Sequence, residues 1–306
     1  MSATIALPRR TARARNTNGE RLAGWLMTLP SAIAFLTMLL LPTVATVLLA
    51  FSDYELGAPD IAWIGLENFT ELLADRGFRQ SARNTLLYVA MVTPAAMLGG
   101  LGLAMLIEAG SRGRAFFRAV FFLPVVSLTV AMAAAWQYLL HPTIGPLNAL
   151  LRQLGMPTPF WLSSSDWVLT SLAAIGAWEN IGFNMVLFMA GLTAIPRELY
   201  AAAEVDGARS AWNRFRLVTW PLLGPTTLFV LTITLIRNLR VFDTVAVLTR
   251  GGPNKASEVL LFTMYQEGFN FLRLGYSAAI TMIFLVVVLG ILWVQTRILD
   301  KRVHYT

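Results

Sequence analysis

Six apolar stretches constrain this sequence more than any other feature, because each is long enough to cross a lipid bilayer. The hydrocarbon core of a bilayer is about 30 Å thick, and about 20 residues of α-helix cross it. The stretches occupy residues 25–51, 84–107, 119–141, 168–194, 222–249 and 277–298. The sequence therefore predicts an all-α, polytopic membrane protein with six transmembrane helices.

Composition supports a lipid environment and excludes several kinds of chemistry. Of the 306 residues, 56% are hydrophobic and 13% are charged, whereas a soluble domain carries about 25% charged residues. The chain has no cysteine, which excludes a disulfide framework, a thiolate metal site and a cysteine nucleophile. Its two histidines, His141 and His304, lie far apart in the sequence. We therefore expect no catalytic residue and no metal site.

The positive charges predict how the chain is oriented in the membrane. The formal net charge is +7, but the arginines lie in short blocks beside the apolar stretches. This pattern is typical of a membrane topology signal, so no nucleic-acid partner is expected. Fifteen lysines and arginines lie on the side of the two termini and of residues 195–221, against seven on the opposite side. Because cytoplasmic loops carry the excess, both termini and the loop at 195–221 are predicted to be cytoplasmic.

This topology divides the chain into three regions. They are a cytoplasmic N-terminal tail at 1–24, a transmembrane domain at 25–298 with its core at 84–298, and a cytoplasmic C-terminal tail at 299–306. The first apolar stretch exceeds the core of a signal peptide and has no small-residue cleavage site at its end, so we expect an uncleaved anchor.

The loops on the opposite side also carry structural signals. An acidic segment with Trp63 and Phe69 predicts a short surface helix within 52–83. Several prolines and a glycine in 142–167 favour a turn-rich cap. The apolar residues of 257–269 are interrupted by glutamates, which predicts a re-entrant or interfacial helix.

The loop at 195–221 is the most informative polar segment. Its three alanines, Ala201, Ala202 and Ala203, favour helix and present almost no side chain, so a partner surface can approach closely. Glu204 and Asp206 place hydrogen-bond acceptors at the end of this helix. Gly207 then allows a turn that a β-carbon would oppose.

A second short helix is expected after that turn. Trp212 and Phe215, three residues apart, form an apolar ridge on it. Pro221 suits the first turn of the helix that follows, where its missing N–H costs nothing. The pattern indicates a surface on which a partner protein docks, although an amphipathic loop lying on the lipid would have the same composition.

This loop resembles the EAA loop of ABC-importer permeases, which reads roughly E-A-A-x-x-D-G-A, then a Phe, then a Leu- or Trp-Pro. The matching positions are Ala202, Ala203, Asp206, Gly207, Ala208, Phe215 and Pro221, while Ala201 replaces the usual first glutamate. In that family the loop grips the ATPase subunits. The resemblance implies the following set of ATPase-coupling residues: Ala201, Ala202, Ala203, Glu204, Asp206, Gly207, Trp212, Phe215 and Pro221.

Other segments are similar to the carbohydrate-importer branch of the same family. They are residues 65–69, 84–86, 121–124, 242–243, 249–253 and 265–269. Glu267-Gly268-Phe269 and the ending Arg302-Val303-His304-Tyr305 look most like the glycerol-3-phosphate permease subgroup. The resemblance implies a permease that forms half of a translocation path for a sugar or a glycerol-3-phosphate-like solute, in a bacterial cytoplasmic membrane.

The resemblance also implies the partners. They are a second permease subunit, an ATPase dimer at the cytoplasmic face and an extracytoplasmic solute-binding protein, all in contact with membrane lipid. The chain has no Gly-Lys-Ser/Thr, so it has no P-loop of its own. We therefore expect no cofactor and no enzymatic activity in this chain, with ATP and Mg bound by the ATPase.

Polar residues inside the fourth and fifth stretches are the candidates for contact with the solute, because ionisable groups in a span are costly and usually face a cavity or a partner. The set comprises Glu179, Asn180, Asn184, Arg237, Arg240 and Asp243. A structural interpretation is also open, in which Arg240 and Asp243 neutralise each other at i, i+3 and Glu179 pairs with an arginine on another helix. Trp136, Trp178 and Tyr265 could stack on a sugar or belong to interfacial aromatic belts.

Three other classes of protein are alternatives. A secondary transporter would need an inverted repeat, which is not evident, and coupling-ion carboxylates, for which only Glu179 and Asp243 are available. An intramembrane enzyme would need a nucleophile with a base, and no histidine or lysine lies well inside a span. A purely structural scaffold would not explain the docking loop.

Overall fold

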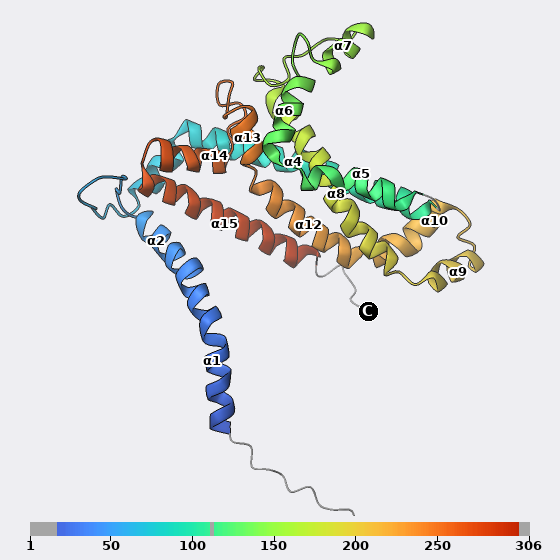
Figure 1. The fold of residues 1–306 in the computed structure, drawn as a ribbon, viewed down its shortest axis with the longest axis horizontal. Coiled ribbons are helices and arrows are strands. Elements are labelled where there is room, and N and C mark those ends of the chain that lie inside the picture. Colours follow the sequence, from blue (N-terminus) through green and yellow to red (C-terminus); the bar gives the residue numbers. More distant parts are fainter. Residues whose placement is uncertain (1–16, 111–112, 300–306) are drawn as a thin grey trace, which may run out of the picture. The chain divides into compact units, whose positions relative to one another are not determined.

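The computed structural model describes residues 17–110 and 113–299, and every regular element in these ranges is a helix (Figure 1). The all-α prediction is therefore confirmed for this part of the chain. Four helices are long and apolar enough to cross a membrane, and two bent helix pairs raise the number to as many as six. The predicted cytoplasmic tails lie mostly outside the described residues.

The described residues of the first unit, 17–48, form a single helical run that continues to Leu49. It consists of α1 (Thr17–Phe35), the π-helical turn η1 (Leu36–Leu40) and α2 (Leu41–Leu49). Its apolar span, Gly24–Leu49, buries no side chain within the chain. The π turn directly precedes the Leu41–Pro42 pair, because proline has no N–H to donate to the preceding turn.

The second unit begins at Leu49 and holds the remaining elements. They are α3 (Glu67–Ala74), α4 (Arg76–Ala109), α5 (Arg114–Val126), α6 (Thr129–Leu139), α7 (Pro146–Gln153), α8 (Val168–Thr193), α9 (Arg197–Val205), α10 (Ala211–Arg214), η2 (Phe215–Thr219), α11 (Trp220–Leu222), α12 (Gly224–Leu239), α13 (Asp243–Leu248), α14 (Leu260–Tyr265), η3 (Gln266–Asn270) and α15 (Leu274–Leu299). Helix α3 confirms the short helix expected within 52–83, and residues 142–167 are rich in turns around α7, as expected. Helix α14 confirms a helix within 257–269, and its re-entrant or interfacial position stays a prediction.

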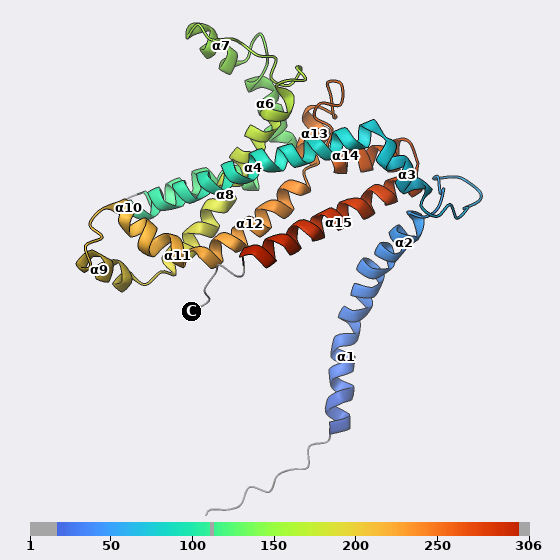
Figure 2. The same ribbon diagram turned by 180° about the vertical axis from the view of Figure 1, so that it is seen from behind.

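Helices α4 and α8 form the centre of this unit and pack along each other, with α12 and α15 beside them (Figure 2). Gly100 on α4 permits their close approach, since a Cβ added there would lie 2.6 Å from the Cβ of Asn184 on α8. Small residues allow membrane helices to pack by backbone contact. Buried apolar side chains, including Met185, Phe188 and Val230, fill the space between α4, α8 and α12.

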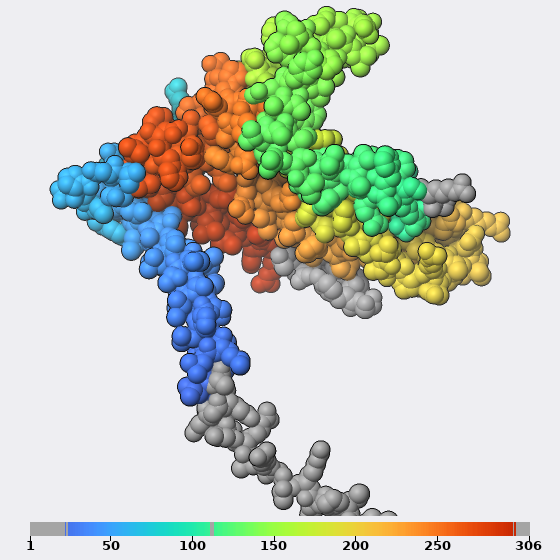
Figure 3. All heavy atoms as spheres, in the orientation of Figure 1, coloured from blue at the N-terminus to red at the C-terminus, as the bar shows by residue number. Residues whose placement is uncertain are grey.

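The third apolar stretch is not one straight span. Helices α5 and α6 meet at an angle of 99°, and α6 runs beside α13 toward α7 (Figures 1 and 3). Pro124 near the end of α5 cannot donate a helical hydrogen bond, and Ser127 and Leu128 are extended. The prediction of a single helix over 119–141 is therefore wrong.

The fifth stretch is also interrupted. Residues 211–222 and 224–248 meet at 69°, and α12 ends at Leu239, before α13 begins at Asp243. The π turn η2 directly precedes the Trp220–Pro221 pair, as η1 precedes Leu41–Pro42. Pro221 lies in the first turn of α11, as predicted from the sequence.

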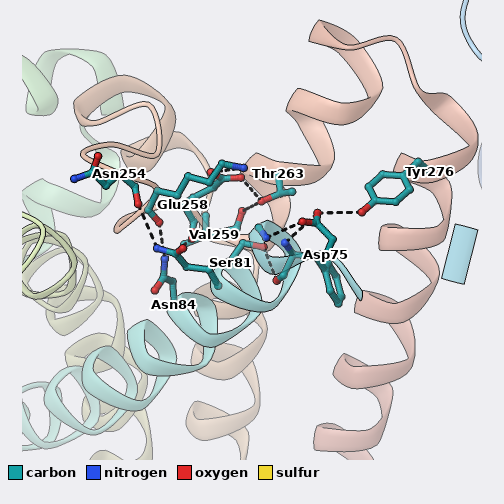
Figure 4. A network of polar contacts seen from close by, with 12 residues as sticks. Asp75, Ser81, Asn84, Asn254, Glu258, Val259, Thr263 and Tyr276 are labelled. Atoms are coloured by element: carbon teal, nitrogen blue, oxygen red, sulfur yellow. Dashed lines mark hydrogen bonds and ion pairs between the residues drawn. The ribbon is translucent and has the colours of Figure 1, made fainter. Parts of the chain in front are cut away.

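A polar network fastens the loop between α13 and α14 to the start of α4 (Figure 4). Asn84 Nδ2 donates to the backbone carbonyls of Lys255, at 3.0 Å, and Glu258, at 2.9 Å. The backbone N–H of Leu260 donates to Thr85 Oγ1 at 2.9 Å. These bonds hold the end of that loop and the start of α14 against α4.

The same end of α4 is capped and linked to α15. Asp75 Oδ1 accepts a hydrogen bond from the backbone N–H of Gly77 at 2.8 Å, as an N-cap residue does. Its other oxygen accepts from the Tyr276 hydroxyl at 3.1 Å (Figure 4). Asp75 therefore satisfies the helix terminus and joins two long helices.

Candidate functional site

The interruption between α12 and α13 creates a polar cavity of about 260 Å³. Arg240 follows the last residue of α12 as its C-cap and Asp243 begins α13, so they do not share a helical face. Five of the six predicted solute-contact residues line this cavity: Glu179, Asn180, Arg237, Arg240 and Asp243. The structure thus brings together side chains from α8, α12 and α13, while Asn184 lies elsewhere.

Two carboxylates and two guanidinium groups face this cavity. In the described part of the chain, none of Glu179, Asp243, Arg237 and Arg240 has an ion-pair partner within 4.0 Å. The proposed neutralising pair of Arg240 and Asp243 is therefore wrong. The Arg237 guanidinium lies over the Phe183 ring, 4.4 Å from the ring centroid. This cation–π contact leaves the N–H groups of Arg237 available to hydrogen-bond acceptors.

A second, apolar cavity adjoins the first and shares Thr129, Glu179 and Thr244 with it. Trp136 and Trp178 line it, with ring centroids 5.4 Å apart and planes at 80°. Its volume of about 20 Å³ has room for about one water molecule. In this conformation the tryptophans therefore close the space that a sugar ring would need.

Tyr265, the third aromatic candidate, lines another cavity of about 460 Å³ between the break after α12, helix α14 and helix α15. Its ring packs edge-on to Phe242 at 5.4 Å and stacks on Phe269 at 5.4 Å. Arg240 and Asp243 line this cavity as well as the polar cavity. The break between α12 and α13 therefore borders two cavities, one lined by aromatic rings and one lined by charged side chains.

Asn184 is fully buried and does not line the polar cavity, so its role as a path residue stays a prediction. Its Oδ1 accepts a hydrogen bond from Thr234 Oγ1 at 2.9 Å. One turn away, Asn180 Nδ2 donates to Asn238 Oδ1 at 3.3 Å, and Asn238 Nδ2 donates to Thr93 Oγ1 at 3.0 Å. These contacts join α4, α8 and α12 in the manner of polar interhelical packing.

Thr234 was missed by the sequence reasoning, and Asn238 was placed in the polar cluster of the fifth stretch but not among the solute-contact candidates. Their i, i+4 spacing on α12 equals that of Asn180 and Asn184 on α8. Equal spacing of polar residues on two successive predicted spans is the signal that could have indicated that Thr234 and Asn238 pair with these asparagines. Asn180 differs from Asn184 because it also lines the cavity, where its buried Oδ1 has no hydrogen-bond partner in the described part of the chain. It is therefore an available acceptor.

The loop at 195–221 folds as a helical hairpin, and we refer to these residues as the docking hairpin. Gly207 has φ +98°, which confirms the glycine turn. Its N–H donates to the carbonyl of Glu204 at 3.2 Å, and the N–H of Ala208 donates to that of Ala203 at 2.8 Å. This pair of bonds is a Schellman motif, which ends α9 and reverses the chain.

The exposed surface of the docking hairpin differs in part from the prediction. Ala201, Ala202, Glu204 and Asp206 are exposed, as expected of a docking surface. Trp212 is 67% exposed, but Phe215 is half-buried and packs against the apolar core at the end of α8. The two rings stack at 5.5 Å.

The apolar ridge thus has one outward residue, Trp212, supported from beneath by Phe215. Pro221, the last residue of the predicted coupling set, is exposed in α11.

Comparison with known proteins identifies the family. Residues 86–305 match the family described as "Binding-protein-dependent transport system inner membrane component". The chain belongs to this family. It is 35% identical to the sn-glycerol-3-phosphate transport system permease protein UgpA of Agrobacterium fabrum, over 79% of this chain and 83% of the relative. It is 32% identical to the probable ABC transporter permease protein YurN of Bacillus subtilis, over 92% of this chain and 97% of the relative.

Structural comparison agrees with the family assignment. A chain of a bacterial ABC transporter involved in the import of the acidic polysaccharide alginate superposes with a TM-score of 0.82 and 25% identity, over 93% of this chain and 97% of that chain. The chain is therefore a permease subunit of an ABC importer and an inner-membrane component. This decides against the secondary transporter, the intramembrane enzyme and the structural scaffold.

Proposed function

We propose that this permease forms one half of a translocation path for a sugar or a glycerol-3-phosphate-like solute and couples it to a separate ATPase. The observation that carries the proposal is the polar cavity at the break between α12 and α13. Its four charged side chains have no ion-pair partner within 4.0 Å in the part of the chain that the structure describes, so their hydrogen-bonding groups are free for a polar solute.

The chemistry of the cavity suits a solute with many hydroxyl groups. Glu179, Asp243 and Asn180 Oδ1 are acceptors for hydroxyl hydrogens, and Arg237 and Arg240 are donors to oxygen. The adjoining pair Trp136 and Trp178 supplies flat apolar surface. Because two positive groups balance two negative ones, a neutral polyol can be accommodated, and a phosphate ester would engage the two arginines.

Coupling to the ATPase is assigned to the docking hairpin. Its Schellman turn fixes the exposed alanine face of α9 beside Trp212 on α10. An alanine face allows close approach, and an exposed tryptophan supplies apolar area to a groove on a partner. The excess of lysine and arginine on this side supports a cytoplasmic position for the hairpin and for both termini.

The remaining assignments follow from the same arrangement. Residues 1–24 and 299–306 are cytoplasmic tails, and residues 25–298 form the permease domain with its core at 84–298. The partners are a second permease subunit, an ATPase dimer that binds ATP and Mg, and an extracytoplasmic solute-binding protein. The assembly lies in a bacterial cytoplasmic membrane.

The test is uptake by the complete transporter reconstituted in liposomes with its binding protein. Replacing Arg237 or Arg240 by glutamine removes a charge-assisted hydrogen bond, which contributes about 1.5–3 kcal/mol. We expect the apparent affinity for a phosphate-bearing solute to fall about tenfold or more, with a smaller effect for a neutral sugar. The control is Arg83→Gln, since Arg83 is exposed on α4 and does not line the cavity.

Two results would contradict the path assignment. One is unchanged uptake of every solute in the Arg237→Gln, Arg240→Gln double variant. The other is an equal loss in the Arg83→Gln control, which would report a change in surface charge.

A further inference from the structure

Another cavity, of about 480 Å³, lies at the base of the docking hairpin. It is bordered by the ends of α4 and α8, by the start of α5 and by α9, α10 and η2. It shares no residue with the translocation cavity. The chemistry of its walls indicates a ligand of its own.

Guanidinium groups dominate the polar wall of this cavity. Three arginines line it, Arg114, Arg197 and Arg214, against one carboxylate, Glu108. Arg114 Nη1 lies 3.2 Å from Glu108 Oε1, so these two charges compensate each other. Neither Arg197 nor Arg214 forms an ion pair in the ranges that the structure describes. The cavity therefore carries two guanidinium groups that lack a counter-charge.

The N-terminus of α9 adds to this positive potential. Helix α9 begins at Arg197, and Ile195 and Arg197 both line the cavity. Pro196, the residue before the helix, makes no side-chain capping bond. The first N–H groups of a helix have no partner within it and carry partial positive charge. An anion beside Arg197 would thus meet both the guanidinium and the end of the helix.

Part of the cavity lining is apolar. Met105 near the end of α4, Leu192 near the end of α8, and Ile195 and Phe215 form this part. These residues belong to the hydrophobic cluster that holds α4 and α8 together. The lining of the cavity therefore combines positive charge with apolar side chains, and the cavity lies at the ends of two helices that are long enough to cross the membrane.

We propose that this cavity binds the headgroup phosphate of an anionic phospholipid. Guanidinium groups match phosphate oxygens in geometry and charge, and Arg197 and Arg214 are the two available donors. The apolar part of the lining suits the upper part of an acyl chain. Basic pockets at the ends of membrane helices are suited to lipid headgroups in this way. A soluble phosphate would use the arginines and leave the apolar part of the lining without a ligand.

A lipid at this site would connect α9 and α10 to the ends of α4 and α8. Any effect on ATPase coupling rests on the proposed function of the docking hairpin. Binding itself does not, so the two can be measured separately.

The experiment measures phosphatidylglycerol bound to the complete transporter by native mass spectrometry, after purification from nanodiscs that contain phosphatidylcholine and increasing phosphatidylglycerol. The variant is Arg197→Gln with Arg214→Gln. The matched control is Arg216→Gln, because Arg216 belongs to the same hairpin, is exposed and does not line the cavity. We expect the apparent affinity for phosphatidylglycerol to fall at least about tenfold in the double variant and to stay unchanged in the control.

Two further measurements test the lipid site. The single variant Arg197→Gln changes an exposed side chain, so it reports on the site if the double variant fails to assemble. Inorganic phosphate is added as a competitor. Equal phosphatidylglycerol binding by the wild type and the arginine variants would overturn the proposal, and so would displacement of the lipid by inorganic phosphate at a similar concentration. Loss of lipid binding with normal ATPase coupling would support the site and separate it from the hairpin's docking role.

Discussion

Replacing Gly207 by valine tests the docking hairpin at its turn. Gly207 has φ +98°, a conformation that residues with a β-carbon rarely adopt. A Cβ built on Gly207 meets no atom within 4 Å. The substitution therefore introduces no clash, and its whole effect comes from the backbone conformation that the turn requires.

The magnitude follows from the turn geometry. A β-branched residue held at such a φ costs about 1–3 kcal/mol. Two backbone hydrogen bonds depend on this conformation, from Gly207 to Glu204 at 3.2 Å and from Ala208 to Ala203 at 2.8 Å. A penalty of this size lowers the ratio of native to altered hairpin about 5- to 150-fold. The rest of the chain is unaffected, since the turn is exposed.

The assay compares ATPase stimulation by solute-loaded binding protein in proteoliposomes that contain the complete transporter. We expect Gly207→Val to insert normally and to lose most of the stimulation. Asparagine tolerates positive φ better than other residues with a side chain, so Gly207→Asn is the matched control at the same position. Alanine, which lacks β-branching, should fall between the two.

The order of the three variants decides the outcome. Coupling that falls from Asn to Ala to Val supports the strained turn as the cause. Normal stimulation with Gly207→Val, or equal losses with Asn and Val, would refute the argument from backbone conformation. Detergent gel filtration of each variant checks that the permease remains assembled with its partner.

Three further predictions concern other parts of the chain. Asn84→Ala removes both hydrogen bonds to the loop after α13 and should lower the free energy of unfolding in detergent by about 1–3 kcal/mol. Arg83→Ala, at the neighbouring position, should leave it unchanged. Equal stability of the two variants would contradict this prediction. Phe215→Ala should release the ATPase during purification and also destabilise the hairpin. Trp212→Ala should weaken retention of the ATPase without destabilising the hairpin. Glu204→Gln should have neither effect, because exposed ion pairs contribute about 0–1 kcal/mol. The purified chain alone should hydrolyse no ATP, and turnover abolished by mutating this chain would disprove that.

Several features of this permease could be derived from the sequence because local chemistry determines them. The apolar stretches are longer than any soluble helix needs, so lipid is their only suitable solvent. Gly207 ends α9 through hydrogen bonds that reach back no more than five residues, so the turn is visible in a short window. Pro221 marks its own helix start in the same way.

The interior of the site could not be derived in this way. Asn180 and Asn184 share one helical face and are equivalent in the sequence. Their roles separate only when α12 packs against α8, where Asn184 is closed off by Thr234, 50 residues away, and Asn180 remains at the cavity wall. Likewise, the three-residue spacing of Trp212 and Phe215 predicts a single apolar ridge, but the core at the end of α8 partly covers Phe215 and leaves Trp212 exposed.

At the break between α12 and α13, too, the sequence indicates the polar residues but not which of them face the cavity. The sequence places Arg237, Arg240 and Asp243 in one apolar stretch, and helical spacing alone pairs the last two. The structure ends α12 at Leu239 and begins α13 at Asp243, so Arg240 and Asp243 do not share a helical face. The packing of α8 beside the break between α12 and α13 decides which charges face the cavity, because a side chain's exposure depends on what packs against it and not on its neighbours in the chain.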